Sequence, residues 1–235
     1  MPFVTADRLE DLGQETTFAE LHARLHLHPR EAELQEFERP DGPPDGRLRI
    51  IDGGVEGAGD IDTGKGPYVV LVDGPLKTSG HLNLWTHEYL PGLVIVRGDL
   101  QARTLSFGNG ARVFVEGSVL VDEWLFGQYG DRNAVLSATG GISARASFLD
   151  THTSIYAKGA VRSLLYASRG GWETLEPDIE NEGEGNGTDF FDPAVLDRYG
   201  DLDFKRAIQA AREGRPLFLP GVEERFPARL TSRKT

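Results

Sequence analysis

The sequence predicts a mainly β fold, a single-stranded β-solenoid of the right-handed parallel β-helix type, with α-helices flanking it at both ends. Five glycines, at positions 74, 98, 117, 140 and 159, carry the same pattern of neighbours. Apolar or small residues stand four and two positions before each glycine, and two and four positions after it. This alternation with a period of two residues indicates strands, and its recurrence indicates stacked coils that share one core. The residues at these positions are Val70, Val72, Leu76 and Thr78; Val94, Val96, Leu100 and Ala102; Val113, Val115, Val119 and Val121; Leu136, Ala138, Ile142 and Ala144; and Ile155, Ala157, Val161 and Ser163.

The spacing of the glycines predicts that long and short coils alternate. Successive intervals are 24, 19, 23 and 19 residues. Short turns are expected at 107–111 and 149–153, and the extra residues of the long coils fall at 84–92, 125–133 and 168–178. Insertions at one phase of a solenoid project from one face. Because neighbouring strands lie about 4.8 Å apart, loops on alternate coils should form a ridge with a spacing of roughly 10 Å.

The N-terminal part, residues 1–46, is expected to be a helical segment followed by a linker. Residues 1–15 are predicted to fray. Thr17 and Glu20 form a capping box, so a helix should begin there and run to about residue 28, with another turn or two at 30–37. Residues 47–66 fit the repeat poorly and are predicted to form a first, irregular coil of the solenoid, which spans 47–172.

The C-terminal part, residues 173–235, is predicted to contain an acidic loop, two short helices and a tail. Residues 173–192 hold eight acidic residues and no Lys or Arg. Asp192 followed by Pro193 is typical of a helix start. A second helix should carry Phe204 and Ile208 on one stripe and end at Gly214.

Composition excludes several classes of protein. The chain has 235 residues, a net charge of −12 and no cysteine. The acidic charge argues against nucleic-acid binding and favours a basic protein partner. Without cysteine there is no disulfide and no thiolate metal site, which favours the cytoplasm. No secretory signal and no long apolar run occurs, so we expect no membrane insertion.

Two short motifs suggest ligands only superficially. Residues 59–66 match a phosphate-binding loop at three positions, but Gly66 replaces the required Ser or Thr and a strand follows. His22 and His26 have the spacing of a zinc pair, yet Ala23 stands where a metalloprotease has its acid, and a surface histidine cluster accounts for them better. We therefore expect no cofactor and no metal.

The predicted partner-binding face consists of residues on the long loops and the turns between them. Tyr and Trp flanked by polar groups are typical of interface hot spots. Trp124 and Phe126 are instead expected to cover the core beneath the second loop. The predicted face comprises His87, Tyr89, Gln128, Tyr129, Asp131, Arg132, Asp150, His152 and Trp172.

These coils resemble a loose group of bacterial β-solenoid proteins with repeated G-D-L-x-A coils. The matching segments are 96–108, 115–131, 139–152 and 157–166, with the turns FGQYGD and FLDTH most similar. Gln128 stands where the group usually has histidine. The resemblance implies an immunity or accessory role beside polymorphic toxins. Bactofilins are similar in coil chemistry but lack helical flanks.

Three hypotheses about function follow. The first is a non-enzymatic solenoid that binds another protein, as an immunity protein binds its toxin, and exists as a monomer or small homo-oligomer. The second is a scaffold that self-assembles like a bactofilin. The third is a carbohydrate-active enzyme, in which carboxylates such as Asp122, Asp131 and Asp150, with Arg132, would gather beside the long loops.

Overall fold

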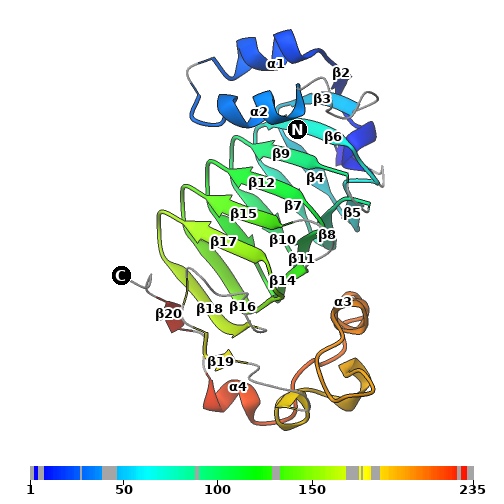
Figure 1. Cartoon of the computed structure of the whole chain (residues 1–235), viewed down its shortest axis with the longest axis vertical. Coiled ribbons are helices and arrows are strands. Elements are labelled where there is room, and N and C mark those ends of the chain that lie inside the picture. The colour runs from blue at the N-terminus through cyan, green and yellow to red at the C-terminus, as the bar shows by residue number, and fades with distance from the viewer. Residues whose placement is uncertain are drawn as a thin grey trace.

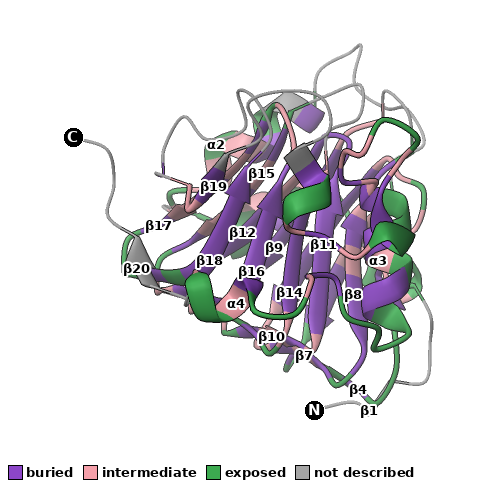
Figure 2. Ribbon diagram, turned by 90° about the horizontal axis from the view of Figure 1, so that it is seen from below, coloured by how far each residue is buried: buried purple, intermediate pink, exposed green. Residues whose placement is uncertain are grey.

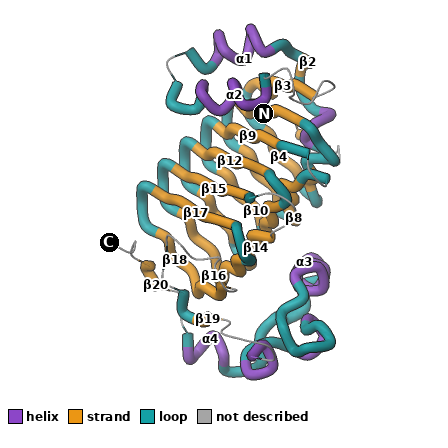
Figure 3. The backbone as a smooth tube through the Cα atoms, viewed as in Figure 1, coloured by secondary structure: helices purple, strands orange, loops and turns teal. Residues whose placement is uncertain are grey.

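Three-sided coils of β-strands are stacked along one axis, with helical segments lying against their sides (Figure 1). The computed structural model describes residues 3–4, 8–26, 28–38, 47–87, 90–128, 133–167, 175, 177–180, 186–226 and 229–231. In each coil the chain passes from one side to the next through short loops, which form columns at the corners (Figure 3). The predicted β-solenoid with flanking helices is therefore confirmed.

We name the three sides of the solenoid faces 1, 2 and 3. Face 1 contains β4 (Val55–Gly57), β7 (Leu76–Thr78), β10 (Leu100–Ala102), β13 (Val119–Val121) and the first parts of β16 (Ile142–Leu149) and β18 (Val161–Ala167). Face 2 contains β5 (Ile61–Asp62), β8 (His81–Trp85), β11 (Thr104–Gly108), β14 (Trp124–Gln128), the second half of β16 and most of β18 (Val161–Ala167). Face 3 contains β3 (Arg47–Asp52), β6 (Tyr68–Asp73), β9 (Gly92–Val96), β12 (Ala111–Val115), β15 (Ala134–Ala138) and β17 (Thr153–Ala157).

The register between coils is the one that the repeat predicts. Val70 pairs with Val94, and the column continues through Val113 and Leu136 to Ile155. The four predicted inward positions of all five coils are buried, none more than 8% exposed. Stacking equivalent aliphatic side chains gives a continuous interior that no single coil could provide.

The repeated glycines form a ladder at the corner between faces 3 and 1. The N–H of Gly117 donates to the carbonyl of Gly98 at 3.1 Å, and Gly140 and Gly159 each bond in the same way to the glycine below. A Cβ at Gly117 would lie only 2.8 Å from the backbone carbon of Gly98. The corner therefore requires glycine because the coils approach too closely there for a side chain.

Residues 47–66 form a regular first coil, so the expectation of an irregular one is wrong. β3 pairs with β6 over six residues, from Arg47 with Tyr68 to Asp52 with Asp73. Val55 continues the inward column of Leu76 and is fully buried. The repeat is hidden in the sequence because Arg49, not an aliphatic residue, pairs with Val70 at this end of the stack.

Residues 3–4 and 8–15, the described part of the segment before α1, lie at the open end of the solenoid, which corrects for these residues the prediction that 1–15 fray. β1 (Phe3–Val4) pairs with β4, and β2 (Gln14–Glu15) pairs antiparallel with β3. Between them the 3-10 turn η1 (Leu9–Asp11) places Leu9, which is fully buried, in the interior cluster. An exposed strand edge invites self-association, and this segment occupies it.

Helices α1 (Phe18–Arg24) and α2 (Glu31–Phe37) pack on the outside of face 3. The hydroxyl of Thr17 accepts the N–H of Glu20 at 3.2 Å, so the predicted N-cap is confirmed, although α1 ends earlier than expected. The buried residues of this layer are Leu21, Leu25, Leu34 and Phe37 from the helical segment, and Ile50, Val69, Leu71, Leu93, Ile95 and Phe114 from the strands.

The C-terminal segment packs on the outside of face 2, where α3 and α4 lie over buried strands (Figure 2). It contains η2 (Asn186–Asp189), η3 (Pro193–Val195), α3 (Phe204–Arg212) and α4 (Val222–Arg225). Asp192 accepts the N–H of Ala194 at 2.8 Å, so the predicted cap before Pro193 is confirmed. At the end of the stack, β19 (Ile179–Glu180) and β20 (Arg229–Thr231) pair with β18. Among the described residues, no helix combines the length and apolar character that crossing a membrane requires.

Candidate functional site

The long insertions all leave the solenoid at the corner between faces 2 and 3, which we call the loop corner. Gly108 pairs with Trp85 on one side and with Gln128 on the other. One residue earlier in β14, Gly127 pairs with Leu149 of β16, and Leu149 pairs with Ala167 of β18. The ends of β8, β11, β14, β16 and β18 are therefore in register, and the loops that follow them start from one column.

Four residues of the predicted partner-binding face lie in the described part of the loop corner. His87 is exposed, and its N–H donates to the carbonyl of Lys65 at 2.7 Å. Gln128 is half-exposed at the end of β14. Asp150 accepts the N–H of Thr151 at 2.7 Å, and His152 is exposed with a left-handed φ of 58°. The other predicted residues, Tyr89, Tyr129, Asp131, Arg132 and Trp172, lie outside the described residues.

A buried asparagine braces the first long loop against the short turn above it. Asn109 has a left-handed φ of 49° and is 1% exposed. Its side-chain amide donates to the carbonyl of Thr86 at 2.9 Å, and the hydroxyl of Thr86 bonds to the carbonyl of Asn109. This reciprocal pair fixes the base of the loop that carries His87.

Trp124 and Phe126 are buried as expected, at 3% and 0% exposed, but they do not cover the core beneath the second loop, because both point outward from face 2. They belong to an aromatic cluster beneath the C-terminal segment. Phe126 stacks on Phe148 at 5.1 Å between ring centroids, and Phe191 and Phe218 stack at 5.3 Å. The sequence does carry a signal for this layer. Residues 124–126, 146–149 and 164–167 are mostly apolar or aromatic without alternation, which indicates strands buried on both sides.

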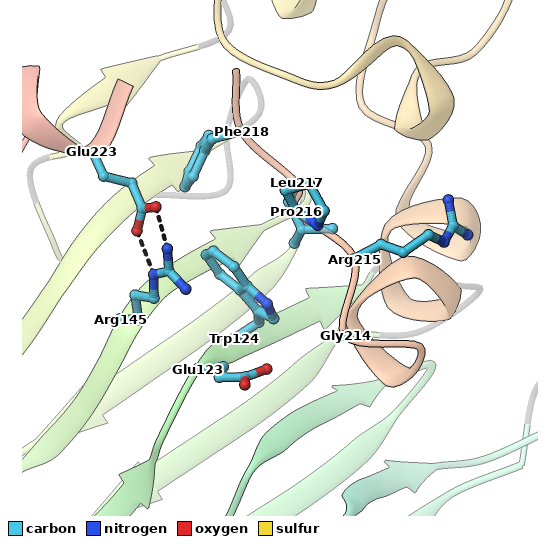
Figure 4. Close-up of a pocket in the computed structure, with 9 residues that line it drawn as sticks. All are labelled: Glu123, Trp124, Arg145, Gly214, Arg215, Pro216, Leu217, Phe218 and Glu223. Carbon is cyan, nitrogen blue, oxygen red and sulfur yellow. Dashed lines mark hydrogen bonds and ion pairs between the residues drawn. The ribbon is translucent and has the colours of Figure 1, made fainter. Parts of the chain in front are cut away.

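A pocket of about 210 Å³ lies where the C-terminal segment meets face 2 (Figure 4). Trp124 forms one wall, opposite Pro216 and Leu217. The Arg145 guanidinium lies 4.7 Å from the Trp124 ring and bonds to both carboxylate oxygens of Glu223, which raises the pKa of Arg145. Nearby, Arg103 donates to the carbonyls of Ala211 and Arg212 at 3.2 and 3.0 Å. These contacts hold the C-terminal segment on the solenoid, so we assign this pocket to its attachment.

A chain of hydrogen bonds runs along the outside of face 2 next to α3. Asn83 donates from its amide nitrogen to Asp62 at 2.8 Å, which turns its amide oxygen toward Ser106. The hydroxyl of Ser106 donates to that oxygen at 2.7 Å and so must accept from Nε2 of His81, 2.9 Å away. His81 Nδ1 then accepts from the hydroxyl of Thr104 at 2.7 Å.

The positions of the protons in this row of hydrogen bonds decide whether His81 can act as a general base toward Ser106. Burial lowers the pKa of His81 to about 4, with Arg212 and Arg103 acting in the same direction, so the ring is neutral at pH 7. Nε2 already carries a proton, and therefore His81 cannot take the proton of Ser106 as a general base would. His81 and Ser106 are 2% and 3% exposed. We conclude that this serine–histidine pair is structural.

The aspartate beside this chain fastens α3. Burial raises the pKa of Asp60, but the N–H of His81 and the Arg212 guanidinium outweigh it and hold the pKa below its usual value. Arg212 donates to Asp60 from Nε at 3.0 Å and from Nη2 at 2.6 Å. Asp60 and Arg212 thereby connect the last turn of α3 to β5.

The histidines near the N-terminus have acidic neighbours. His22 lies 2.9 Å from Glu38 and 3.4 Å from Glu31, and His28 lies 2.5 Å from Glu116. The hydrogen bond that His22 donates to the Glu38 carboxylate raises the pKa of His22, against the opposing effect of burial. Within the described ranges, no group of three or more His, Asp and Glu could hold a metal ion. These histidines thus pair with α2 and the solenoid.

Comparisons with protein-family models, with curated proteins and with solved structures yield no match. The geometry of the chain itself is therefore what supports a function.

Proposed function

We propose that the protein is a non-enzymatic β-solenoid that binds another protein at the loop corner. In its specific form the proposal is an immunity protein that neutralises a bacterial polymorphic toxin in the cytoplasm. One observation carries it: the ends of β8, β14 and β18, from which the long insertions leave, are in register at a single corner. Loops held by a rigid scaffold are where recognition residues concentrate.

The way the chain covers its own faces supports the loop corner as the binding surface. The C-terminal segment packs on face 2 from β11 to β18, and α1 with α2 covers face 3 from β3 to β12. Face 1 presents a single outward column of mixed polarity, from Glu56 and Lys77 to Arg162. In the described part of the loop corner, His87 and His152 are exposed and Gln128 and Asp150 are half-exposed.

Charge supports a basic partner. The net charge of −12 would accelerate encounter with a positively charged domain, most strongly at low ionic strength. This preference concerns the rate of association, and the contacts at the loop corner would determine how long the complex lasts.

The ends of the solenoid bear on the scaffold alternative. β1 and β2 pair with strands of the first coil, and β19 and β20 pair with β18 of the last. A filament built by stacking solenoids end to end needs free strand edges at both ends. Among the described residues, β17 of face 3 pairs only with β15, so one strand edge of the last coil stays open. The other edges are occupied, which favours the protein-binding proposal, and light scattering of the pure protein should find a monodisperse monomer or small oligomer.

The residues named for a carbohydrate-active enzyme give that alternative little support. Asp131 and Arg132 lie outside the described residues, and Asp122 is exposed in a turn between faces 1 and 2, away from the loop corner. A glycosidase needs two carboxyl groups facing one sugar ring. The outward carboxylates on face 2, Asp60 and Asp62, are bonded to Arg212 and Asn83.

The test is to coexpress the protein with the product of each neighbouring gene, as candidate toxins, and to measure growth and complex formation. Wild type should restore growth and copurify with the toxin at a one-to-one ratio. The double variant His87→Ala, Gln128→Ala should lose both effects, whereas Lys77→Ala on face 1 should keep them. The proposal fails if wild type neither binds the toxin domain nor alters its toxicity.

A further inference from the structure

Helix α2 stops short of the last strands of face 3 and leaves a groove beside it. The buried layer under α1 and α2 extends to Phe114 on β12. Beyond it, outward residues of β15 and β17 such as Val135 and Tyr156 are half-exposed. The groove between these strands and the N-terminal end of α2 has a volume of about 420 Å³. In Figure 1, β15 and β17 lie at the end of face 3 farther from α1 and α2.

The floor of the groove is aromatic and the groove is open at its surface. Phe114 is 6% exposed, and the guanidinium of Arg30 lies 4.0 Å above its ring. Arg30 also donates to the hydroxyl of Ser137 at 3.3 Å. Tyr156 continues the column of Phe114 and Ser137. An aromatic floor with fixed polar groups around it is typical of a site for a protein side chain.

The charge of the groove is opposite to that of the protein. Its cations are Arg30, Arg112 and Lys158, whereas Glu33 is the only carboxylate among its lining residues. Glu33 lies 2.5 Å from Arg112 and 3.6 Å from Arg30, so one carboxylate is shared by two guanidinium groups. Glu116, which follows β12 directly, pairs with His28 and Arg97. The groove is therefore locally positive on a chain of net charge −12.

We propose that this groove binds a segment of a partner protein that presents an Asp or Glu side chain next to an apolar one. The carboxylate would lie between Lys158 and Arg30, and the apolar side chain would contact Tyr156 and Phe114. This inference rests on the proposed function, since it names the chemistry of a second contact with the same partner. β15 and β17 begin at the loop corner and line the groove, with Lys158 just beyond the far end of β17, so a partner that spans the length of these strands reaches both sites. A nucleic acid fits less well because its phosphates would be repelled by the rest of the acidic surface.

The experiment selects displayed peptides of twelve residues on the purified protein and measures their affinity by fluorescence anisotropy. Selected sequences should share an Asp or Glu beside an apolar residue. Their binding should weaken at least tenfold in Lys158→Glu and in Tyr156→Ala. Lys77→Glu, which makes the same charge change on face 1, should bind like wild type. Thermal unfolding followed by circular dichroism verifies that each variant is folded.

Several outcomes would overturn the inference. They are the absence of enriched peptides, enrichment of basic peptides, equal binding to Lys158→Glu, and tighter binding of a labelled single-stranded oligonucleotide than of any peptide. Toxin neutralisation, measured separately, distinguishes the two proposals. If no peptide binds the groove but the double variant His87→Ala, Gln128→Ala still abolishes neutralisation, the groove proposal is wrong and the proposed function stands. Peptides that bind the groove while wild type neutralises nothing contradict the proposed function alone.

Discussion

One outward column of face 3 crosses from a covered region to an open one. It runs in register through Leu71, Ile95 and Phe114 to Ser137 and Tyr156. Leu71 and Ile95 are each 1% exposed beneath α1 and α2, whereas Ser137 and Tyr156 are half-exposed. The backbone is the same in both regions, so what differs is the side chain and what lies over it.

The change in side chains follows the change in cover. In β6 and β9 the residues are apolar on both sides, as in a strand buried on both faces. In β15 and β17 apolar inward residues alternate with Ser137, Ser154 and Tyr156, as in a strand with one open face. The outward residues of each strand therefore indicate whether it is covered: they are apolar where α1 and α2 lie over the strand and mostly polar where the strand is open.

The largest effect expected is from a charge placed under α1. Ile95→Asp would bury an unpaired carboxylate, and we expect a loss of about 5 kcal/mol or more in the free energy of unfolding. Val96→Asp, on the inner side of the same strand, should be equally damaging. Ser137→Asp, in the same column but in the open region, should cost less than about 1 kcal/mol in a urea titration. If Ile95→Asp and Ser137→Asp lower the free energy of unfolding by similar amounts, the distinction between covered and open regions is wrong.

The cover on face 2 can be tested at its central ring. Phe148 has ring neighbours on its own sheet and in the C-terminal segment, including Phe126 and Phe218. Phe148→Ala should cost about 3–5 kcal/mol because it opens a cavity at that contact. Tyr199→Ala, a residue of the same segment that is 53% exposed, is the matched control and should stay within about 0.5 kcal/mol. If the two variants unfold at the same urea concentration, the aromatic cluster does not attach the segment.

The buried histidine predicts a pH dependence. The pKa of His81 is lowered to about 4 from 6.5, so in this range the unfolded chain binds more protons than the folded one. Stability is then complete above pH 6.5 and falls as the pH decreases toward 4, by about 3 kcal/mol in total. His81→Gln should lack this component when both proteins are unfolded by urea at several pH values. Parallel curves for the two proteins would show that His81 is not held neutral by the fold.

How much of this could be predicted differs between the inside and the outside of the coils. The inward positions and the glycine corner were predictable because they repeat, and a repeat needs no knowledge of distant segments. The cover of face 2 depends on Phe191 and Phe218, which reach Phe148 from far along the chain. In the sequence, only the apolar character of both sides of β14 and β18 indicates that another segment must cover the outside of face 2.

For the candidate site, only its position within each coil could be predicted from the sequence. Insertion lengths indicated one corner, and the register confirms that the flanking strand ends share it. The groove beside α2 could not be predicted, because it depends on where α2 crosses β12 and on contacts between residues distant in sequence, Arg30 with Phe114 and Glu33 with Arg112. The hydrogen-bond chain through His81 likewise needs the pairing of β8 with β11.

The glycine ladder offers a smaller effect with an internal control. A Cβ at Gly117 would lie 2.3 Å from Oδ1 of Asp99 and 2.8 Å from the backbone of Gly98, so Gly117→Ala should cost about 1–3 kcal/mol. At Gly59 nothing lies within 4 Å of the added atom, and Gly59→Ala should change stability by less than about 0.5 kcal/mol. The comparison is made by thermal unfolding, and equal melting temperatures would contradict a close-packed corner.

The central claim, that the loop corner binds a protein partner, is tested most directly by the affinity of loop variants for the toxin domain. Tyr89→Ala and Tyr129→Ala should leave the free energy of unfolding within about 0.5 kcal/mol of wild type. By calorimetric titration, at least one of them should weaken binding by about 2 kcal/mol, roughly thirtyfold in Kd, if a hot spot lies on these loops. Lys77→Ala on face 1 should bind like wild type. The account is contradicted if both loop variants bind as tightly as wild type while Lys77→Ala loses affinity.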